Sequence, residues 1–140
     1  MTMLVVDASV VAKWFFPEDY STESRRLLSQ DRALLAADLI WCEVGNIAWK
    51  RVRRGELESE EAAQVIADLI RMPLEITPTQ GLLAPALEIA IATDRTVYDC
   101  IYLALAIDRD CRFVTADERL VNALAVTPFA SHVRHVAKRR

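Results

Sequence analysis

Residues 4–9 read LVVDAS, and this stretch decides the fold class of the chain. Three consecutive apolar residues, two of them β-branched, are typical of a short buried strand. The Asp-Ala-Ser that follows is typical of a turn, and the next apolar residues, 10–16, are typical of a helical turn or two that ends before Pro17. We therefore expect a buried strand that leads directly into a helix.

The same alternation of short apolar strands and helices continues along the chain. Further strands are expected at residues 33–37, 74–77, 112–115 and 132–136, the last at an edge of the sheet. Helices are expected at residues 10–16, 21–30, 39–54, 59–72, 85–92, 98–109 and 118–125, with Asp38 as an N-cap and Pro85 at a helix start. This order predicts an α/β fold in which helices cover both faces of a parallel sheet.

The composition is that of one compact domain, and we expect residues 1–140 to form it. A hydrophobic fraction of 53% can fill a core without disulfides or a structural metal. The three cysteines, Cys42, Cys100 and Cys111, are widely spaced and are expected to be reduced thiols in a cytoplasmic protein. Since there is no apolar run of about 18 residues, we expect no membrane-spanning helix, and no targeting segment is expected either.

A formal net charge of −3 is unusual for a protein that binds nucleic acid. Net charge is a bulk property, however, and a local group of carboxylates can account for it. Four acidic residues stand in apolar surroundings instead of a solvated face: Asp7, Glu43, Asp99 and Asp117. Two of them follow predicted strands, and the other two lie near the starts of predicted helices.

Strand ends and the starts of the following helices lie on the same rim of a parallel sheet, so all four carboxylates can point into one crevice. Each also has a purely structural explanation. Asp7 would suit a turn, Asp117 would suit a helix N-cap, and Glu43 and Asp99 would suit the positive end of a helix dipole. The combined pattern favours a shared site over four separate coincidences.

Such a site needs a cation or protons. Two carboxylates about 5 Å apart repel by roughly 3 kcal/mol at an effective dielectric constant near 20. Ligands that are all oxygen suit hard cations, so Mg²⁺ or Mn²⁺ is the expected cofactor. These ions activate water and bind phosphate oxygens, which points to phosphodiester cleavage.

At these residues the chain resembles the PIN-domain nucleases, and most of all the VapC-type toxins of bacterial toxin–antitoxin pairs. The matching stretches are residues 5–9, Glu43 with Asn46, residues 98–106 and residues 113–117, together with residues 13–15 and 17–18. The resemblance implies a three-layer α/β/α sandwich with a short central parallel sheet. It also implies a Mg²⁺-dependent endoribonuclease, a VapB-like antitoxin partner and a homodimer.

The resemblance assigns the catalytic quartet to Asp7, Glu43, Asp99 and Asp117, and it gives Ser9 and Thr115 as supporting hydroxyls. Our hypothesis is that Asp7 and Asp99 hold the metal directly or through water and that Asp117 completes or shares the coordination, either of this ion or of a second ion that arrives with the substrate. Glu43 would orient or deprotonate the attacking water. Because water is then the nucleophile, the products should carry 5′-phosphate and 3′-hydroxyl ends.

Other residues are candidates for support or RNA binding. Asn46 lies one helical turn after Glu43 and could bind a carboxylate or a phosphate, or simply be exposed. Possible RNA contacts are Lys50, Arg51, Arg53 and Arg54, and the basic tail His132, Arg134, His135, Lys138, Arg139 and Arg140 is a similar candidate. A charged stripe is more often a solvated face, and the two histidines are given no ligand role. Trp14, Phe15 and Phe16 are expected to pack in the core or at an interface.

Three other functions fit parts of the pattern. A PIN nuclease that processes RNA without being a toxin would use the same four acids. A metal-free acidic module that binds a basic partner would need no catalysis. A phosphotransfer domain would explain Asp7 after a strand, but Ser9 stands where haloacid-dehalogenase-like enzymes have a second aspartate.

Overall fold

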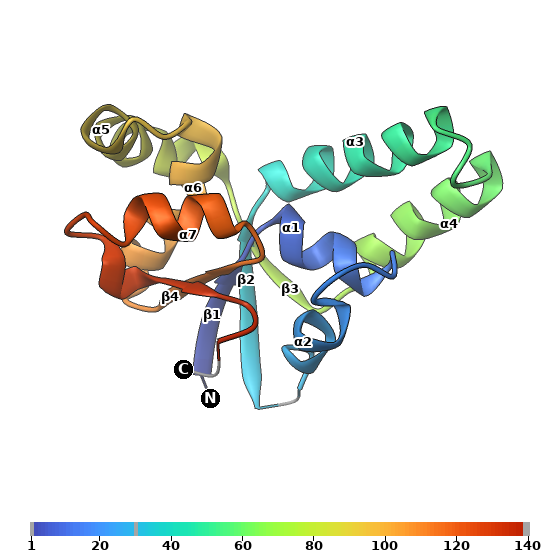
Figure 1. The fold of residues 1–140 in the computed structure, drawn as a ribbon, viewed down its shortest axis with the longest axis horizontal. Helices are drawn as coiled ribbons and strands as arrows, with labels where there is room; N and C mark the ends of the chain where they lie inside the picture. Colours follow the sequence, from blue (N-terminus) through green and yellow to red (C-terminus); the bar gives the residue numbers. More distant parts are fainter. Residues whose placement is uncertain (1, 30, 139–140) are drawn as a thin grey trace.

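The computed structural model describes residues 2–29 and 31–138. They form a five-stranded sheet in the order β3-β2-β1-β4-β5, and every neighbouring pair of strands is parallel (Figure 1). The strands are β1 (Thr2–Val6), β2 (Arg32–Ala37), β3 (Leu74–Thr77), β4 (Arg112–Thr115) and β5 (Val133–His135). The predicted parallel sheet is confirmed, and β5 lies at an edge as expected.

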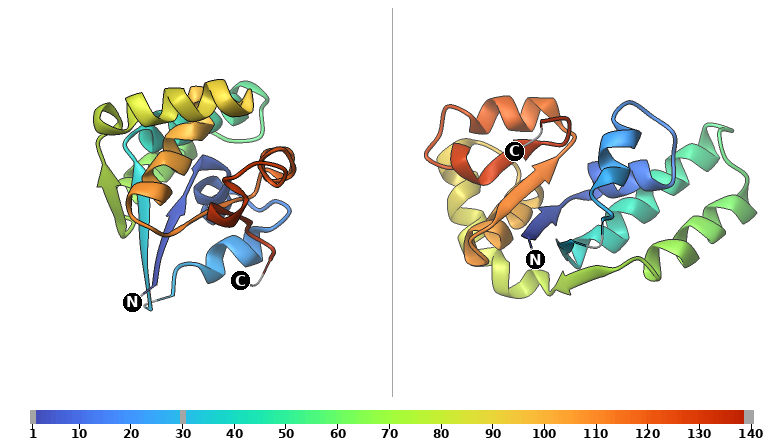
Figure 2. Two further views of the ribbon diagram at one scale, coloured as in Figure 1. Left: turned by 90° about the vertical axis from the view of Figure 1, so that its left-hand side faces the viewer. Right: turned by 90° about the horizontal axis from the view of Figure 1, so that it is seen from below.

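Seven α-helices accompany these strands in the described part of the chain. They are α1 (Ala8–Val11), α2 (Ser21–Arg26), α3 (Leu39–Arg53), α4 (Ser59–Ile70), α5 (Leu83–Thr93), α6 (Val97–Asp108) and α7 (Glu118–Leu124). Short 3-10 turns are η1 (Ala12–Trp14), η2 (Thr79–Leu82) and η3 (Ala130–His132). Helix α6 packs on β1, β2 and β4 and is covered by α5. Figures 1 and 2 show α3 and α4 running side by side away from the sheet.

Helix boundaries account for the differences between prediction and structure. Asp38 is the N-cap residue of α3, as expected, but its side chain accepts no hydrogen bond from that helix. Its carboxylate instead accepts from the Thr79 backbone N–H at 2.9 Å. The helix expected from Pro85 begins at Leu83, because the preceding 3-10 turn leads into it. The helix expected at residues 21–30 ends at Arg26, and Gln30 lies outside the described residues.

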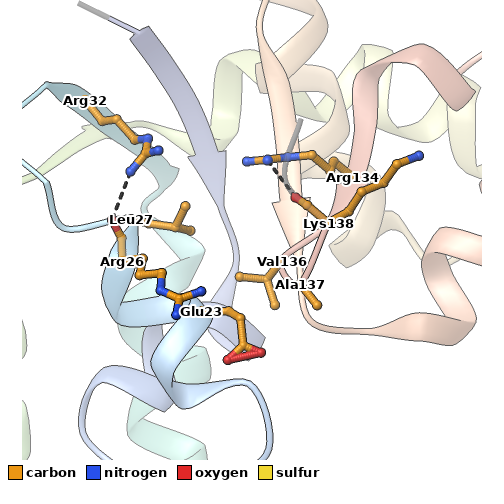
Figure 3. A pocket seen from close by; sticks show the side chains of 8 residues that line it. All are labelled: Glu23, Arg26, Leu27, Arg32, Arg134, Val136, Ala137 and Lys138. Carbon is orange, nitrogen blue, oxygen red and sulfur yellow. Dashed lines mark hydrogen bonds between the residues drawn. The ribbon is translucent and has the colours of Figure 1, made fainter.

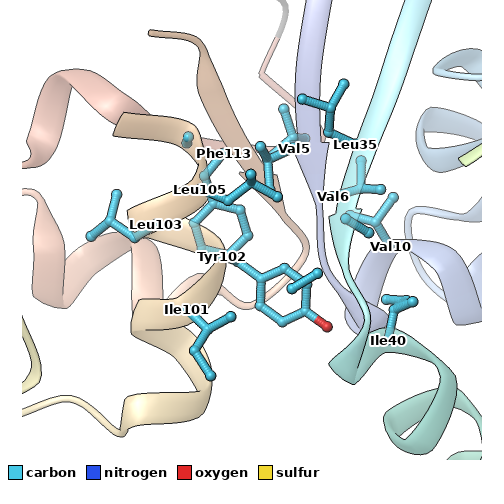
Figure 4. Packing of buried hydrophobic residues seen from close by; sticks show 14 of the residues in the cluster. Val5, Val6, Val10, Leu35, Ile40, Ile101, Tyr102, Leu103, Leu105 and Phe113 are labelled. Atoms are coloured by element: carbon cyan, nitrogen blue, oxygen red, sulfur yellow. The ribbon is translucent and has the colours of Figure 1, made fainter. Parts of the chain in front are cut away.

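The core is built on α6, in which every residue from Cys100 to Ala106 is buried. The Tyr102 ring stacks on Phe113 of β4, with ring centroids 5.9 Å apart. Figure 4 shows Tyr102 and Phe113 on one side of β1, while Val6 and Val10 lie on its other side. Burial on all sides explains why this stretch of α6 is apolar throughout, and it makes the polar groups of Asp99 and Tyr102 conspicuous.

A search of the described residues finds no helix that is both long and apolar enough to cross a bilayer. Two of the cysteines are shielded, with Cys100 buried and Cys111 partly so, while Cys42 is exposed on α3. All three are free thiols in the structure.

Candidate active site

Strand order brings two of the predicted acids together. Asp7 directly follows β1, and Asp117 comes two residues after β4. These strands are neighbours in the sheet, with Val6 paired to Val114, so both carboxylates leave the same edge. Glu43 lies in the second turn of α3, which starts after β2, and Asp99 lies in the first turn of α6.

Asp7 is buried, and hydrogen bonds hold both of its carboxylate oxygens. The Ser9 hydroxyl donates to Oδ1 at 2.6 Å, and the Thr115 hydroxyl donates to Oδ2 at 2.7 Å. The backbone N–H of Val10 also donates to Oδ1, at 3.3 Å, so Asp7 caps α1 as well. The two hydroxyls named as supporting residues therefore contact the carboxylate that they were expected to support.

Burial nevertheless dominates the ionisation of this group. Desolvation raises the pKa of Asp7 to about 6, against the lowering effect of its hydrogen bonds from Ser9, Thr115 and Val10. The charge of Asp99 raises this pKa further. The metal-free site consequently carries a carboxylate that is mostly ionised at pH 7 but takes up a proton as the pH falls through about 6.

Asp117 has the structural role that its position suggested, in addition to its place in the site. Its Oδ1 accepts from the backbone N–H groups of Arg119 at 3.0 Å and Leu120 at 3.2 Å, which caps α7. Its own N–H donates to the Thr115 hydroxyl at 3.2 Å. Thr115 thus connects Asp7 and Asp117, so the two strand ends are joined by one short network.

Glu43 is half-buried and is held from the opposite helix. The hydroxyl of Tyr102 donates to Glu43 Oε1 at 2.5 Å. Burial raises the pKa of Glu43; the bond from Tyr102 lowers it, and the charges of Asp7 and Asp99 raise it. Sequence reasoning missed Tyr102, although it stands three residues after Asp99 on the same face of a buried helix. A buried tyrosine hydroxyl needs a partner, and that was the available signal.

Mutual repulsion links all four carboxylates. Burial raises the pKa of Asp99, a hydrogen bond with Thr96 lowers it, and the charge of Asp117 raises it. Asp99 in turn raises the pKa of both Asp7 and Glu43. The tertiary structure therefore brings the four acids into one electrostatically coupled site.

The donor set fits a hydrated divalent ion. Within residues 2–29 and 31–138, no three His, Cys, Asp or Glu side chains are grouped so that they could hold a metal by themselves. The site nevertheless offers the carboxylate oxygens of four acids, and the pKa values of Asp7, Glu43 and Asp99 are raised by burial and by neighbouring acidic charges. Mg²⁺ usually keeps several water ligands and binds through one or two carboxylates, which matches this arrangement.

The basic residues of α3 differ in their freedom to contact RNA. Arg51 is engaged by Glu18 at 2.8 Å and Glu56 at 3.5 Å, and its guanidinium lies 4.5 Å from the centre of the Phe16 ring. Arg53 lies over the exposed Trp49 ring at 4.7 Å. The remaining predicted residues of this helix, Asn46, Lys50 and Arg54, are exposed. Lys50 is seven residues beyond Glu43, which is about 10 Å along the helix axis.

Other candidates from the sequence take structural positions. Trp14 and Phe16 are buried and Phe15 is partly buried, so these aromatic side chains serve packing. His135 ends β5 opposite Thr115, and its Nε2 lies 3.9 Å from Glu118 Oε1, nearer the acidic edge than the sequence indicated. Arg139 and Arg140 of the basic tail lie outside the described residues.

Comparison with known proteins gives a family match and a close relative. The PIN domain family model matches residues 4–125. The chain is 36% identical over 129 residues to Ribonuclease VapC3 of Pyrobaculum aerophilum, and the match covers 89% of this chain and 98% of that protein.

Solved structures show the same fold at lower identity. PAE2754 from Pyrobaculum aerophilum has a TM-score of 0.72 at 21% identity, covering 96% of this chain and 84% of that one. VapC20 of Mycobacterium tuberculosis, described as a Sarcin-Ricin loop cleaving toxin, has a TM-score of 0.66 at 16% identity, with coverage of 86% and 94%. A toxin–antitoxin complex from Klebsiella pneumoniae gives 0.67 at 14% identity, with coverage of 97% and 99%.

Proposed function

This chain belongs to the PIN domain family, as a VapC-type RNA-cleaving hydrolase, and on that basis we propose that it is the endoribonuclease toxin of a VapBC-type pair. We further propose that it uses Mg²⁺ or Mn²⁺ and that residues 1–140 act as a single nuclease domain. The observation that carries the proposal is the coupling of four carboxylates around the hydrogen-bonded Asp7.

The proposed roles follow from these contacts. Asp7, Asp99 and Asp117 would hold the ion, with Ser9 and Thr115 fixing the orientation of the Asp7 carboxylate. A bound Mg²⁺ or Mn²⁺ supplies positive charge that favours ionisation of water and offsets the charge of the phosphate. Burial and neighbouring acids raise the pKa of Glu43, which suits it to accept a proton at neutral pH.

The proton and bond changes define the products. Glu43 takes a proton from water, the water oxygen forms a bond to phosphorus, and the bond from phosphorus to the 3′ oxygen breaks. The leaving 3′ oxygen takes a proton from solvent water and becomes a 3′-hydroxyl, and the phosphate stays on the 5′ oxygen of the next nucleotide. Tyr102 keeps Glu43 in place during this transfer through its hydroxyl.

Two exposed apolar surfaces support the proposed partners. A cavity of about 260 Å³ between α3 and α4 is lined by Trp41, Ile66, Leu69 and Ile70, and Ile70 is 65% exposed. We assign this groove to an apolar helix of a VapB-like antitoxin.

Leu83, Leu87 and Ile91 are spaced four residues apart on α5 and are each about half or more exposed, at 49%, 50% and 76%. We assign this stripe to a second copy of the chain, because the three residues form an exposed apolar strip along α5 that contains no charged side chain.

The direct test is end-mapping of RNA cut by the purified protein with Mn²⁺, beside an Asp99→Asn variant. We expect discrete 5′-phosphate and 3′-hydroxyl ends that are absent with Asp99→Asn. Asp108→Asn is the matched control, because Asp108 is exposed at the other end of the same helix and should leave cleavage unchanged. Ends carrying 2′,3′-cyclic phosphate would refute the mechanism. If neither the wild-type protein nor either variant cleaves RNA, the proposed nuclease activity is refuted.

A further inference from the structure

Three arginines lie on one face of the sheet, and two of them, Arg32 and Arg112, stand at the strand ends opposite the four acids. Arg32 begins β2, Arg112 begins β4, and Arg134 lies within β5. Strand pairing aligns Arg32 with Thr2, Arg112 with Leu4, and Arg134 with Val114. Residues paired across parallel strands point to the same face, and so do alternate residues of one strand, so all three arginines lie on one face.

These arginines line two adjoining cavities. The larger, of about 360 Å³, is lined by Thr2, Leu4, Arg32, Arg112 and Arg134. The smaller, of about 240 Å³, shares Arg32 and Arg134 and is also bordered by α2 and the segment after β5, including Arg26, Lys138 and Glu23 (Figure 3). No acidic side chain lines the larger cavity, where the three arginines are the charged lining residues.

None of the three arginines forms an ion pair with a described residue. Among residues 2–29 and 31–138, no carboxylate lies within 4.0 Å of the guanidinium nitrogens of Arg32, Arg112 or Arg134. Two of them donate instead to backbone carbonyls, Arg32 to Arg26 at 2.9 Å and Arg134 to Lys138 at 2.8 Å. The Nε of Arg134 is buried and has no hydrogen-bond partner among the described residues.

The pKa of Arg134 reflects its burial and the positive charges around it. Burial lowers the pKa of Arg134, and the charges of Arg112 and Arg32 lower it further. A buried N–H donor without a partner and three like charges around one cavity are both unfavourable in the protein alone. A small anion that accepts from several guanidinium groups would relieve both.

We propose that this cavity is a phosphate-binding site, separate from the acidic edge and independent of the cleavage reaction. Guanidinium groups present planar pairs of N–H donors that match phosphate oxygens, and an unpaired Arg cluster is the usual means of recognising that group. Leu4 lines the cavity, and Asp7 lies three residues farther along the chain, about 10 Å along the direction of β1, so the two sites do not share a ligand atom. The phosphate belongs either to RNA or to a free phosphate compound.

Thermal unfolding in inorganic phosphate tests the site itself, with chloride at equal ionic strength as the reference. For the wild-type protein we expect the Tm to rise by about 4 °C when phosphate is tenfold above its Kd. Arg112→Gln should lose most of this rise, and without phosphate it should be no less stable, because it removes repulsion. Arg71→Gln, an exposed arginine at the end of α4, is the control and should behave as wild type.

Equal stabilisation of wild type and Arg112→Gln by phosphate would overturn the proposal. So would a large loss of stability in Arg112→Gln without phosphate, since it would make the arginine a structural group. Arg134→Gln provides a second variant that should also lose the phosphate effect on Tm, and Arg112 is exposed enough that its substitution should not prevent folding.

Binding of a short RNA identifies the source of the phosphate, measured by fluorescence anisotropy in the Asp99→Asn background so that no cleavage occurs. If RNA supplies it, Arg112→Gln should weaken RNA binding about tenfold and reduce the salt dependence by about one phosphate contact. If RNA affinity is unchanged while the phosphate effect on Tm is lost, the ligand is a free phosphate compound. Because the Tm experiment involves no cleavage, its outcome does not depend on the nuclease being correct.

Discussion

The hydroxyl of Tyr102 on α6 donates a hydrogen bond to Glu43 Oε1 on α3 at 2.5 Å. The tyrosine ring is held by the core, where it stacks on Phe113. Burial and the neighbouring charge of Glu43 raise the pKa of the Tyr102 hydroxyl, so it stays protonated and remains a donor. The rigid core therefore sets the position of the carboxylate that we propose as the proton acceptor.

Tyr102→Phe should lower cleavage about tenfold, because Glu43 loses the donor that positions it. The hydrogen bond lowers the pKa of Glu43, so its removal should raise that pKa and move the acidic limb of the rate profile to higher pH. A pH profile of kcat measures both effects. Tyr98→Phe is the control, since Tyr98 is 62% exposed on the same helix, and an unshifted profile in Tyr102→Phe would contradict the role.

Asp7→Asn should stabilise the metal-free protein at pH 7. The folded-state pKa of Asp7 is raised from 3.8 to about 6, so ionisation opposes folding as pH rises through that interval. The gain from substitution is about 1–3 kcal/mol at pH 7 and should fade as pH falls toward 4. Urea unfolding at both pH values measures it. A variant that is less stable than wild type at pH 7 would mean that the hydroxyl contacts outweigh burial.

Millimolar Mn²⁺ or Mg²⁺ should raise the Tm of the wild-type protein, because a cation relieves repulsion among the acids. The effect should be larger at pH 7 than at pH 5, since the ion competes with the proton that Asp7 binds with a pKa of about 6. Thermal scans at the two pH values check this. Asp99→Asn should weaken the response, whereas equal shifts in both proteins would place the ion elsewhere.

Ile91→Glu should convert a dimer into a monomer, because it puts a charge on the apolar stripe of α5, where Ile91 is 76% exposed. Light scattering coupled to gel filtration should show the mass halved. Glu88→Gln changes an exposed residue of the same helix and should leave the mass unchanged. A wild-type protein that is monomeric at all concentrations would rule out the stripe as a dimer face.

Replacing Arg51 or Arg54 with glutamine should have different effects on RNA binding and on protein stability. Arg54→Gln should weaken RNA binding without affecting stability, because Arg54 is exposed at the end of the helix. Arg51→Gln should instead lower stability by about 1 kcal/mol, as it loses ion pairs with Glu18 and Glu56 and its contact with Phe16. Filter binding and urea unfolding of both variants measure the difference. Equal loss of RNA affinity would show that Arg51 also reaches the substrate.

Most of the fold could be predicted because its signals are local. Short apolar runs bounded by turn residues located β1, β2, β3 and β4, and an acid directly after an apolar run located Asp7. The differences lie at helix ends, as with Asp38, whose carboxylate bonds to Thr79 from a segment 41 residues away. A cap depends on where that distant segment lies, and local propensity does not contain this information.

The amino-acid sequence by itself determined the alternation of strands and helices and the four acids placed at their ends, because both depend on hydrophobic patterning over a few residues. Tertiary structure alone decided that β1 lies beside β4, so that Thr115 reaches Asp7 across 108 positions of sequence. It also decided the rotation of α6 that points Tyr102 at Glu43, and the strand register that gathers Arg32, Arg112 and Arg134 on one face. Strand order, register and helix rotation are set by how the whole core packs, so contacts that depend on them appear only in the folded chain.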